Sequence, residues 1–259
     1  MFSTQRMYTA MQSALVSSQD RAYWLLQLML IELGFDWTQR RTLPDQIFEV
    51  IRTEAHEPTA AQKVWNLLGS RSHTVGDKLV GRADLITSQV QPHLFGKQLL
   101  DFGCGDGQVG AQLSSSGFIT ASHDVADYRK NKTGSFTSDW SDLGTLKFDS
   151  TLAVAVFHHC DEPDLEIERL ANITSRLVVI ESVIDSAMPW EIQALVDWIY
   201  NRGLHPGASI PVPGNFRTVQ GWSDTFARYG FTVRHTEDLG IDLPIVPEHH
   251  VLFVLDRKI

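Results

Sequence analysis

Cysteine is scarce in this chain, and long hydrophobic runs are missing. The 259 residues include two cysteines, Cys104 and Cys160, too few for the disulfide framework of a small secreted domain. The longest apolar stretch near the start, residues 23–33, is interrupted by Gln27 and Glu32. No run approaches the roughly 18 apolar residues that cross a bilayer. We therefore expect neither a disulfide-stabilised fold nor a membrane span.

Positive charge is also in short supply. Lysine and arginine number 22 against 31 acidic residues, which gives a net charge of −9. Because contacts with phosphates need concentrated positive charge, this balance argues against a duplex nucleic-acid partner and favours a small-molecule substrate. Residues 1–17 carry no continuous apolar segment and no small-residue cleavage site of a secretory signal. A cytoplasmic location is the resulting expectation.

The first part of the chain has the pattern of helices. Apolar residues recur there at three- and four-residue spacing, and strand signals are nearly absent. The predicted helices cover residues 9–16, 20–33, 44–52, 59–68 and 75–90. Residues 1–74 are accordingly predicted to form a helical cap, and these helices could also form the interface of a homodimer.

From Lys97 onward, short apolar runs alternate with helical or turn-rich segments. This alternation predicts an α/β domain with right-handed crossovers between parallel strands. Two further strands near the end are joined by a Pro-rich loop, which permits an antiparallel edge. The predicted strands are 98–102, 118–122, 150–157, 176–181, 231–235 and 250–255. We predict a doubly wound, mostly parallel, seven-stranded sheet with an antiparallel edge strand over residues 75–259. An insertion around residues 182–222 is predicted on the substrate side.

A glycine-rich segment, Asp101-Phe102-Gly103-Cys104-Gly105-Asp106-Gly107, lies between a predicted strand and a predicted helix. Glycines at such a turn allow positive φ and close approach of a ligand to the backbone, and the N–H groups of the helix start favour a carboxylate. A dinucleotide-binding fold also places glycines here. However, Asp101 and Asp106 crowd negative charge where a pyrophosphate would lie. The turn therefore favours a positively charged ligand.

The residues from Leu99 to Gly107 closely resemble the first motif of class I S-adenosylmethionine-dependent methyltransferases, an apolar pair followed by D-x-G-C-G-x-G. The resemblance extends over about residues 97–181, because Asp124 follows the second strand, Asp139 follows a third short strand, and Phe157-His158-His159 ends the fourth. It implies a Rossmann-like fold, S-adenosylmethionine as the cofactor, and methyl transfer as the activity.

The resemblance also implies roles for individual residues. Asp124 would accept hydrogen bonds from the ribose hydroxyls. Asp139 and Trp140 would meet the adenine, with a helix N-cap as the alternative role of Asp139. The complete predicted cofactor set is Asp101, Gly103, Cys104, Gly105, Gly107, Asp124, Val125, Asp139, Trp140 and Phe157.

Methyl transfer is an in-line displacement, so the enzyme must align the acceptor and remove any proton that it carries. His158 and His159 are the candidate catalytic bases, although such residues can also merely shape a pocket. The predicted substrate-binding residues are His205, Asn215, Arg217, Glu248, His249 and His250. Arg217 could pair either with an acidic substrate group or with surface carboxylates. No metal site is predicted, because His249 and His250 are adjacent on a strand and point to opposite faces.

Three functions remain open at this point. The leading hypothesis is a methyltransferase that acts on a small molecule. A methyltransferase acting on a macromolecule is the second, although the Asn/Asp-Pro-Pro-Tyr/Phe type of sequence used on base amino groups is replaced here by Phe157-His158-His159-Cys160. The third is a cofactor-binding protein without methyl-transfer activity.

Overall fold

The computed structural model describes residues 4–14, 19–204 and 210–258. The chain divides into two compact units, each built from separate segments. Unit 1 comprises Met1–Leu79, Ser182–Thr218 and Gly240–His250, and unit 2 comprises Val80–Glu181, Val219–Leu239 and Val251–Ile259. Along the described residues, no helix is long and apolar enough to cross a membrane.

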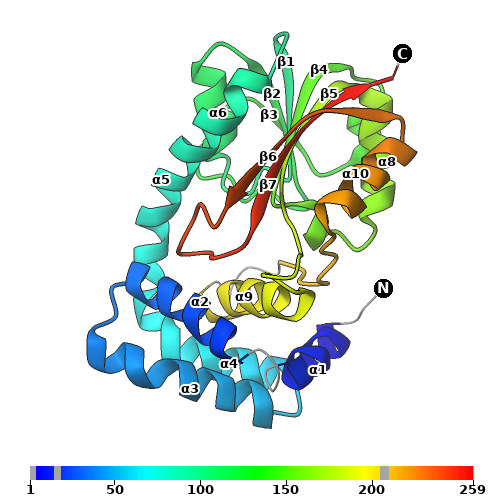
Figure 1. Ribbon diagram of the computed structural model, residues 1–259. Helices are drawn as coiled ribbons and strands as arrows, with labels where there is room; N and C mark the ends of the chain where they lie inside the picture. Colours follow the sequence, from blue (N-terminus) through cyan, green and yellow to red (C-terminus); the bar gives the residue numbers. More distant parts are fainter. Residues whose placement is uncertain (1–3, 15–18, 205–209, 259) are drawn as a thin grey trace. The chain divides into compact units, whose positions relative to one another are not determined.

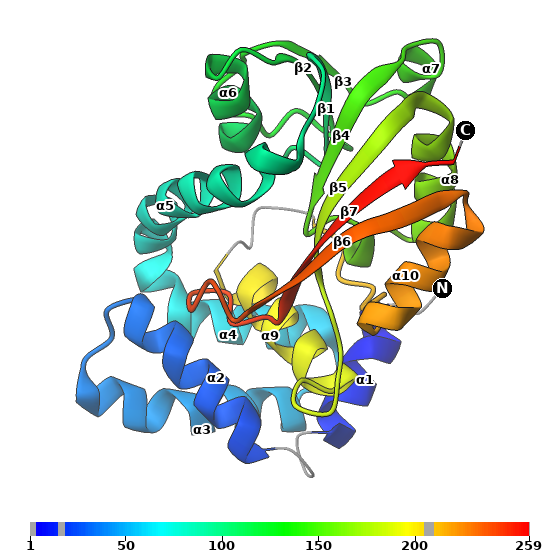
Figure 2. The ribbon, with the colours of Figure 1, turned by 45° about the horizontal axis from the view of Figure 1, so that its top comes forward.

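The centre of unit 2 is a seven-stranded sheet in the order β3-β2-β1-β4-β5-β7-β6. Its first five strands run parallel, and β7, which lies between β5 and the edge strand β6, runs antiparallel to its neighbours (Figure 2). The strands are β1 (Gln98–Phe102), β2 (Ile119–His123), β3 (Ser135–Thr137), β4 (Phe148–Val154), β5 (Thr174–Ser182), β6 (Phe231–Gly240) and β7 (His250–Arg257). The doubly wound, mostly parallel sheet predicted from the alternating pattern is confirmed.

Helices cover both faces of this sheet (Figure 1). On one face, the last part of α5 (Ser72–Val90) and α6 (Gln108–Ser115) pack on β-strand residues such as Leu152 and Val178. On the other, Phe157 lies against Trp222 and Phe226 of α10. The remaining helical elements are α7 (Trp140–Leu143), α8 (Pro163–Ile173), α10 (Val219–Arg228), η2 (Gln91–His93) and η3 (Phe157–His159).

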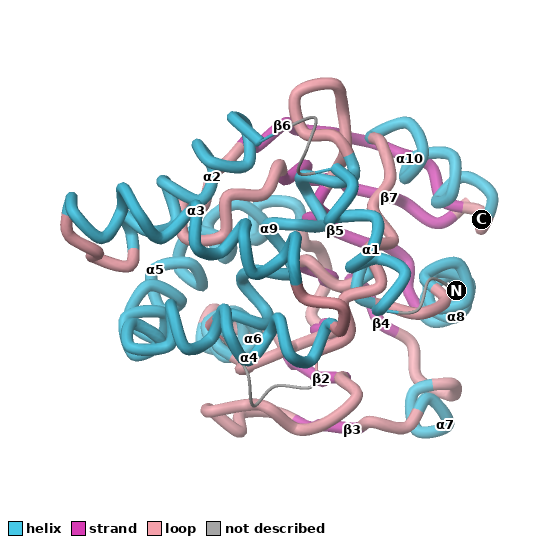
Figure 3. Tube along the Cα trace, turned by 90° about the horizontal axis from the view of Figure 1, so that it is seen from below, coloured by secondary structure: helices cyan, strands magenta, loops and turns pink. Residues whose placement is uncertain are grey.

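Unit 1 is helical (Figure 3). Its helices are α1 (Thr4–Ala14), α2 (Gln19–Glu32), α3 (Trp37–Thr53), α4 (Glu57–Leu68), η1 (Gly69–Arg71) and α9 (Trp190–Gly203). Helix α9 packs against α1, α2 and α4, and its fully buried Trp198 lies 5.6 Å from the ring of Tyr8. The N-terminal helical region predicted from the sequence is therefore present.

Among the differences from the predicted bounds, two concern unit 1. Helix α3 begins at Trp37 instead of Pro44, because Asp36 and Gln39 form a capping box: the Gln39 N–H donates to Asp36 Oδ1 (2.9 Å) and the Asp36 N–H donates to Gln39 Oε1 (3.2 Å). An insertion on the substrate side was predicted around residues 182–222. Of these, Ser182–Thr218 group with the N-terminal helices in unit 1, because α9 buries its apolar side chains there.

Candidate functional site

The turn between β1 and α6 contains three glycines with left-handed backbone. Gly103, Gly105 and Gly107 have φ values of +69°, +50° and +75°. A Cβ on Gly103 would lie 2.3 Å from Val156 Cγ2, and one on Gly107 would lie 2.8 Å from Arg129 Cγ. A Cβ on Gly105 would meet no atom within 4 Å. Packing therefore requires Gly103 and Gly107, whereas Gly105 leaves open space beside the backbone, where a ligand can approach.

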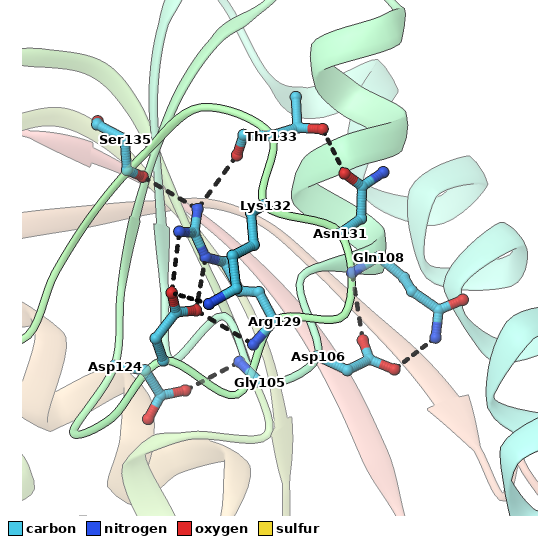
Figure 4. Close-up of polar contacts among 10 residues, drawn as sticks. Gly105, Asp106, Gln108, Asp124, Arg129, Asn131, Lys132, Thr133 and Ser135 are labelled. Atoms are coloured by element: carbon cyan, nitrogen blue, oxygen red, sulfur yellow. Dashed lines mark hydrogen bonds and ion pairs between the residues drawn. The ribbon is translucent and has the colours of Figure 1, made fainter.

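Asp124, which follows β2, holds this turn with its carboxylate (Figure 4). The Gly105 N–H donates to Asp124 Oδ2 at 2.9 Å, and the Val125 N–H donates to Oδ1 at 2.7 Å. Burial raises the pKa of Asp124, although the two amides oppose the rise. The Val125 side chain itself is exposed. Because each carboxylate oxygen has a second lone pair, Asp124 can position the turn and still accept from a ligand hydroxyl.

Asp101, at the end of β1, is a buried acid. It is 5% exposed, and its Oδ2 atom has no hydrogen-bond partner among the described residues. Burial, together with the negative charge of Asp124, raises the pKa of Asp101 to about 7, although the Gly110 backbone amide opposes this rise. Burial likewise raises the pKa of the neighbouring Cys104, which therefore stays a thiol. A ligand with a positive charge or a hydrogen-bond donor would satisfy the Asp101 carboxylate.

The loop after Asp124 closes over the turn from the other side. Asp106 accepts the Gln108 N–H at the start of α6 (3.2 Å), and its backbone carbonyl accepts the Lys130 N–H (2.9 Å). Arg129 is buried and donates to Asp127 Oδ1 (2.9 Å), Thr133 O (3.2 Å) and Ser135 O (3.4 Å), as Figure 4 shows in part. Sequence analysis did not identify Arg129, because one arginine in a polar loop resembles a surface residue.

The predicted adenine residues have structural roles of their own. Asp139 is the N-cap of α7, since the Ser141 N–H donates to its Oδ1 at 2.8 Å, and this bond lowers the pKa of Asp139. The capping alternative is thus confirmed, and the adenine contact stays a prediction. The Trp140 ring lies 5.1 Å from His123 and 5.6 Å from Phe102. Phe157 is completely buried, so its side chain packs in the core, and its contact with the cofactor stays a prediction.

At the end of β4, the loop that carries His158 is fixed by Glu181. This glutamate, near the end of β5, is fully buried. Its Oε1 accepts the N–H groups of Val156 (2.8 Å) and Phe157 (2.6 Å), and its Oε2 lies 2.6 Å from His158 Nδ1. The loop begins at Ala155, a non-glycine residue with φ +53°, a conformation that costs free energy and is enriched at functional sites. His158 is buried, and the ring of half-buried His159 lies 4.1 Å from it.

Sequence analysis overlooked Glu181 although a signal was present. The residue interrupts an otherwise apolar strand, Leu177-Val178-Val179-Ile180-Glu181. An acid in such a run is expensive to bury without partners, so its presence indicates a specific hydrogen-bonding task. The Glu181 carboxylate thereby connects the amides of Val156 and Phe157 and the ring of His158 at the ends of the neighbouring strands β4 and β5.

The predicted substrate-binding residues belong to unit 1. Glu248 and His250 are buried there: the Ser182 hydroxyl donates to Glu248 Oε2, and His250 Nδ1 lies 2.7 Å from Asp242 Oδ1. Burial opposes a charge on His250, but Asp242 and Glu248 outweigh it and raise its pKa. Both residues therefore belong to an internal polar network of unit 1.

The other four differ in their surroundings. His249 Nδ1 lies 3.1 Å from Asp185 Oδ2, so the two adjacent histidines contact different carboxylates. The carbonyl of Arg217 accepts the Ile184 N–H at 3.1 Å, and Asn215 is half-buried. His205 lies outside the described residues. A substrate role for any of these residues is a proposal. Next to them lies the buried Gln193, whose Oε1 accepts the His249 N–H at 3.5 Å.

Comparison with known proteins gives matches in structure alone. No family model matches the chain, and no curated protein does. The mitomycin 7-O-methyltransferase MmcR has a TM-score of 0.52 and 15% identity, with 85% of this chain and 68% of that chain covered. Magnesium protoporphyrin IX methyltransferase from Synechocystis PCC 6803 with bound S-adenosylhomocysteine has a TM-score of 0.50 and 18% identity, with 73% of this chain and 86% of that chain covered. The [4+2]-cyclase SpnF has a TM-score of 0.52 and 14% identity, with 68% of this chain and 81% of that chain covered.

These likenesses establish the fold. The seven-stranded sheet, its antiparallel edge and its flanking helices form the Rossmann-like fold of class I S-adenosylmethionine-dependent methyltransferases, as the glycine motif predicted. One of the similar structures is described as a cyclase. The chemistry of this chain must therefore be argued from its own residues.

Proposed function

We propose that this chain is an S-adenosylmethionine-dependent methyltransferase with a small-molecule acceptor. The observation that carries the proposal is the open turn at Gly105, flanked by Asp101 and Asp124 at the carboxyl ends of β1 and β2. Ligands of open α/β sheets bind at this edge. Similar structures include enzymes whose names give mitomycin and magnesium protoporphyrin IX as their acceptors, which supports a small molecule over a macromolecule.

The residues of the turn fit this cofactor in charge. Its ammonium and sulfonium groups suit a site with two acids, one of which has a buried oxygen without a partner. The start of α6 places the positive end of a helix dipole next to the turn, which suits the cofactor carboxylate. Asp124 would hold the ribose, and Asp139 and Trp140 would meet the adenine. When bound, S-adenosylmethionine supplies an electrophilic methyl group.

His158 is the proposed base. Because Glu181 Oε2 lies 2.6 Å from Nδ1, it favours the tautomer with a proton on Nδ1, and Nε2 becomes the atom that receives a proton from the acceptor. Glu181 itself is held by the two backbone amides, so the imidazole has a fixed orientation. Asn215, Arg217 and His249 are proposed on the acceptor side, with His205, Glu248 and His250 retained as candidates.

The experiment separates chemistry from cofactor binding. Purified wild-type chain, His158→Gln and Glu181→Gln are incubated with S-adenosylmethionine and a panel of phenols, carboxylic acids and amines, and formation of S-adenosylhomocysteine is measured. We expect turnover of the accepted compound to fall by about 10²–10⁴-fold in His158→Gln, the usual contribution of a general base, with unchanged affinity for S-adenosylmethionine. In Glu181→Gln turnover should also fall, because a neutral amide no longer stabilises the imidazolium that forms when His158 takes the proton.

His159→Gln is the matched control, since it changes the neighbouring half-buried imidazole, whose ring centroid lies 4.1 Å from that of His158. Equal turnover in His158→Gln and wild type would contradict the base role. An even loss of cofactor affinity and turnover in all three variants would indicate a structural role for this loop. A wild-type chain that binds no S-adenosylmethionine would overturn the proposed function itself.

A further inference from the structure

A second group of ligating side chains lies in unit 2, away from the glycine turn. His93, His235 and Glu237 each place a nitrogen or carboxylate oxygen so that all three atoms lie within 4.8 Å of one another. His93 ends η2, the short turn after α5, whereas His235 and Glu237 lie on the edge strand β6. No metal site was predicted from the sequence, because adjacent His249 and His250 point to opposite faces of a strand. Residues from segments as distant as those of His93 and His235 cannot be grouped by spacing.

The local geometry explains how the three side chains meet. His235 and Glu237 are two residues apart on a strand, so they point to the same face, and His235 Nε2 lies 3.5 Å from Glu237 Oε2. The His93 ring stacks on the His235 ring, with centroids 5.2 Å apart and planes inclined by 21°. Two imidazoles and one carboxylate are a ligand set that zinc accepts, with a fourth position for water.

Two arginines and one aspartate lie near the cluster. Arg176 donates to the His93 carbonyl at 3.1 Å and would repel a cation. Asp256 lies 2.8 Å from Arg176 Nε and 2.9 Å from Arg234 Nε, so this one carboxylate offsets part of the positive charge of the two arginines.

The position of the cluster separates it from the proposed cofactor turn. The Phe95 N–H donates to Ser150 Oγ at 3.0 Å, near the start of β4, and the His93 carbonyl is bound by Arg176, near the start of β5. The cluster therefore lies toward the amino ends of the parallel strands, whereas the glycine turn follows the carboxyl end of β1. An ion at this place would link the end of α5 to the edge strand.

We propose that His93, His235 and Glu237 bind one zinc-class divalent ion that fastens β6 to the α5–η2 turn. The proposal is independent of the methyltransferase function. Its test uses the untagged full chain after treatment with EDTA and dialysis, titrated with zinc chloride by calorimetry. We expect one ion per chain, with affinity at least about tenfold weaker in His235→Gln and in Glu237→Gln. Cobalt should give the visible absorption of a tetrahedral site in the wild type, and this absorption should be lost in His235→Gln.

His73→Gln, which changes an exposed histidine outside the cluster, is the matched control and should leave zinc affinity unchanged. At a hundredfold excess of zinc over the Kd, the melting temperature of the wild type should rise by roughly 5 °C or more. Because His235 and Glu237 are largely exposed, their variants should fold, and circular dichroism checks this. Absence of stoichiometric binding, or equal affinity in the wild type and His235→Gln, would overturn the proposal.

Discussion

A buried carboxylate costs folding free energy when it ionises, and Asp101 is in this situation because its Oδ2 has no partner among the described residues. Its pKa of about 7 in the folded chain compares with about 3.9 in unfolded chains. Between these values the folded state holds a proton that the unfolded state has released. The free energy of unfolding contributed by Asp101 is therefore highest at low pH and falls as the pH rises through about 4 to 7.

Asp101→Asn should remove this dependence. Urea unfolding of the wild type and of the variant is measured from pH 5 to pH 8 without ligand. At pH 8 the variant is expected to be more stable by roughly 1–4 kcal/mol, whereas at pH 5 the two chains should differ much less. Unfolding curves that keep the same separation at every pH would show that Asp101 is not protonated on folding.

Single residues were predicted from the sequence where the motif is local. Asp101, the three glycines and Asp124 all lie in or beside one turn, because the order strand, glycine turn, helix and next strand fixes their positions. Glu181 and Arg129 were not identified. The role of Glu181 depends on a partner in another segment, the amide of Val156. Arg129 donates to groups only a few residues away, such as the carbonyl of Ser135, but neither contact leaves a spacing signal in the chain.

At the scale of elements, the turn between β1 and α6 gives the sharpest test of where a ligand approaches. Gly103→Val would collide with Val156 and threaten the fold, whereas a side chain at Gly105 enters open space. Gly105→Ala should therefore leave a folded chain with markedly weaker affinity for S-adenosylmethionine, because the new methyl group occupies space next to the backbone amides. Affinity is measured by calorimetry and folding by circular dichroism.

Gly117→Ala is the control for backbone strain. Gly117 also has positive φ, +97°, and its Cβ would be in ordinary contact at 3.7 Å from Lys97 Nζ. It precedes β2, so it lies at the opposite end of that strand from Asp124. Both variants should lose stability by about 1–2 kcal/mol from the left-handed conformation, but Gly105→Ala alone should lose cofactor affinity. Equal affinities in the two variants would place the ligand elsewhere.

Elements were predictable where turn residues bound a short apolar run or where one face of a helix is buried. The strand Gln98–Phe102 was predicted with its observed bounds, and α5 was predicted to end where it does, at Val90. Helix α9 was not predicted, because eleven of its fourteen residues are buried, including Gln193, Asp197 and Asn201. A helix buried all round lacks the alternation of apolar and polar faces on which sequence patterns depend.

At the scale of the whole molecule, the two units are each assembled from separate segments of the chain. The sequence predicted a cap followed by one continuous domain, which assumes that neighbours in sequence are neighbours in space. The segments 182–218 and 240–250 depart from this rule by packing with the N-terminal helices, because the apolar surface of α9 is matched by that of α1, α2 and α4. Composition and periodicity cannot show which partner covers such a surface.

The whole chain has a net charge of −9, and its glycine turn concentrates acids at the proposed cofactor position. Acids at this position repel the dianionic dinucleotides that other Rossmann-like folds bind, and they attract the positive groups of the proposed cofactor. The central claim is therefore a claim about which ligand the turn accepts.

The most direct measurement is a calorimetric titration of the full chain with S-adenosylmethionine, S-adenosylhomocysteine and NADH in parallel. It is repeated on Asp124→Ala and on the control Asp149→Ala. The carboxylate of Asp149 also accepts two backbone amides, from Lys97 (2.7 Å) and Gln98 (2.9 Å), but at the start of β1. We predict one site for the first two ligands and none for NADH, with binding weakened by about 1–3 kcal/mol in Asp124→Ala and unchanged in Asp149→Ala. Binding of NADH, or equal affinity for S-adenosylmethionine in wild type and Asp124→Ala, would contradict the account.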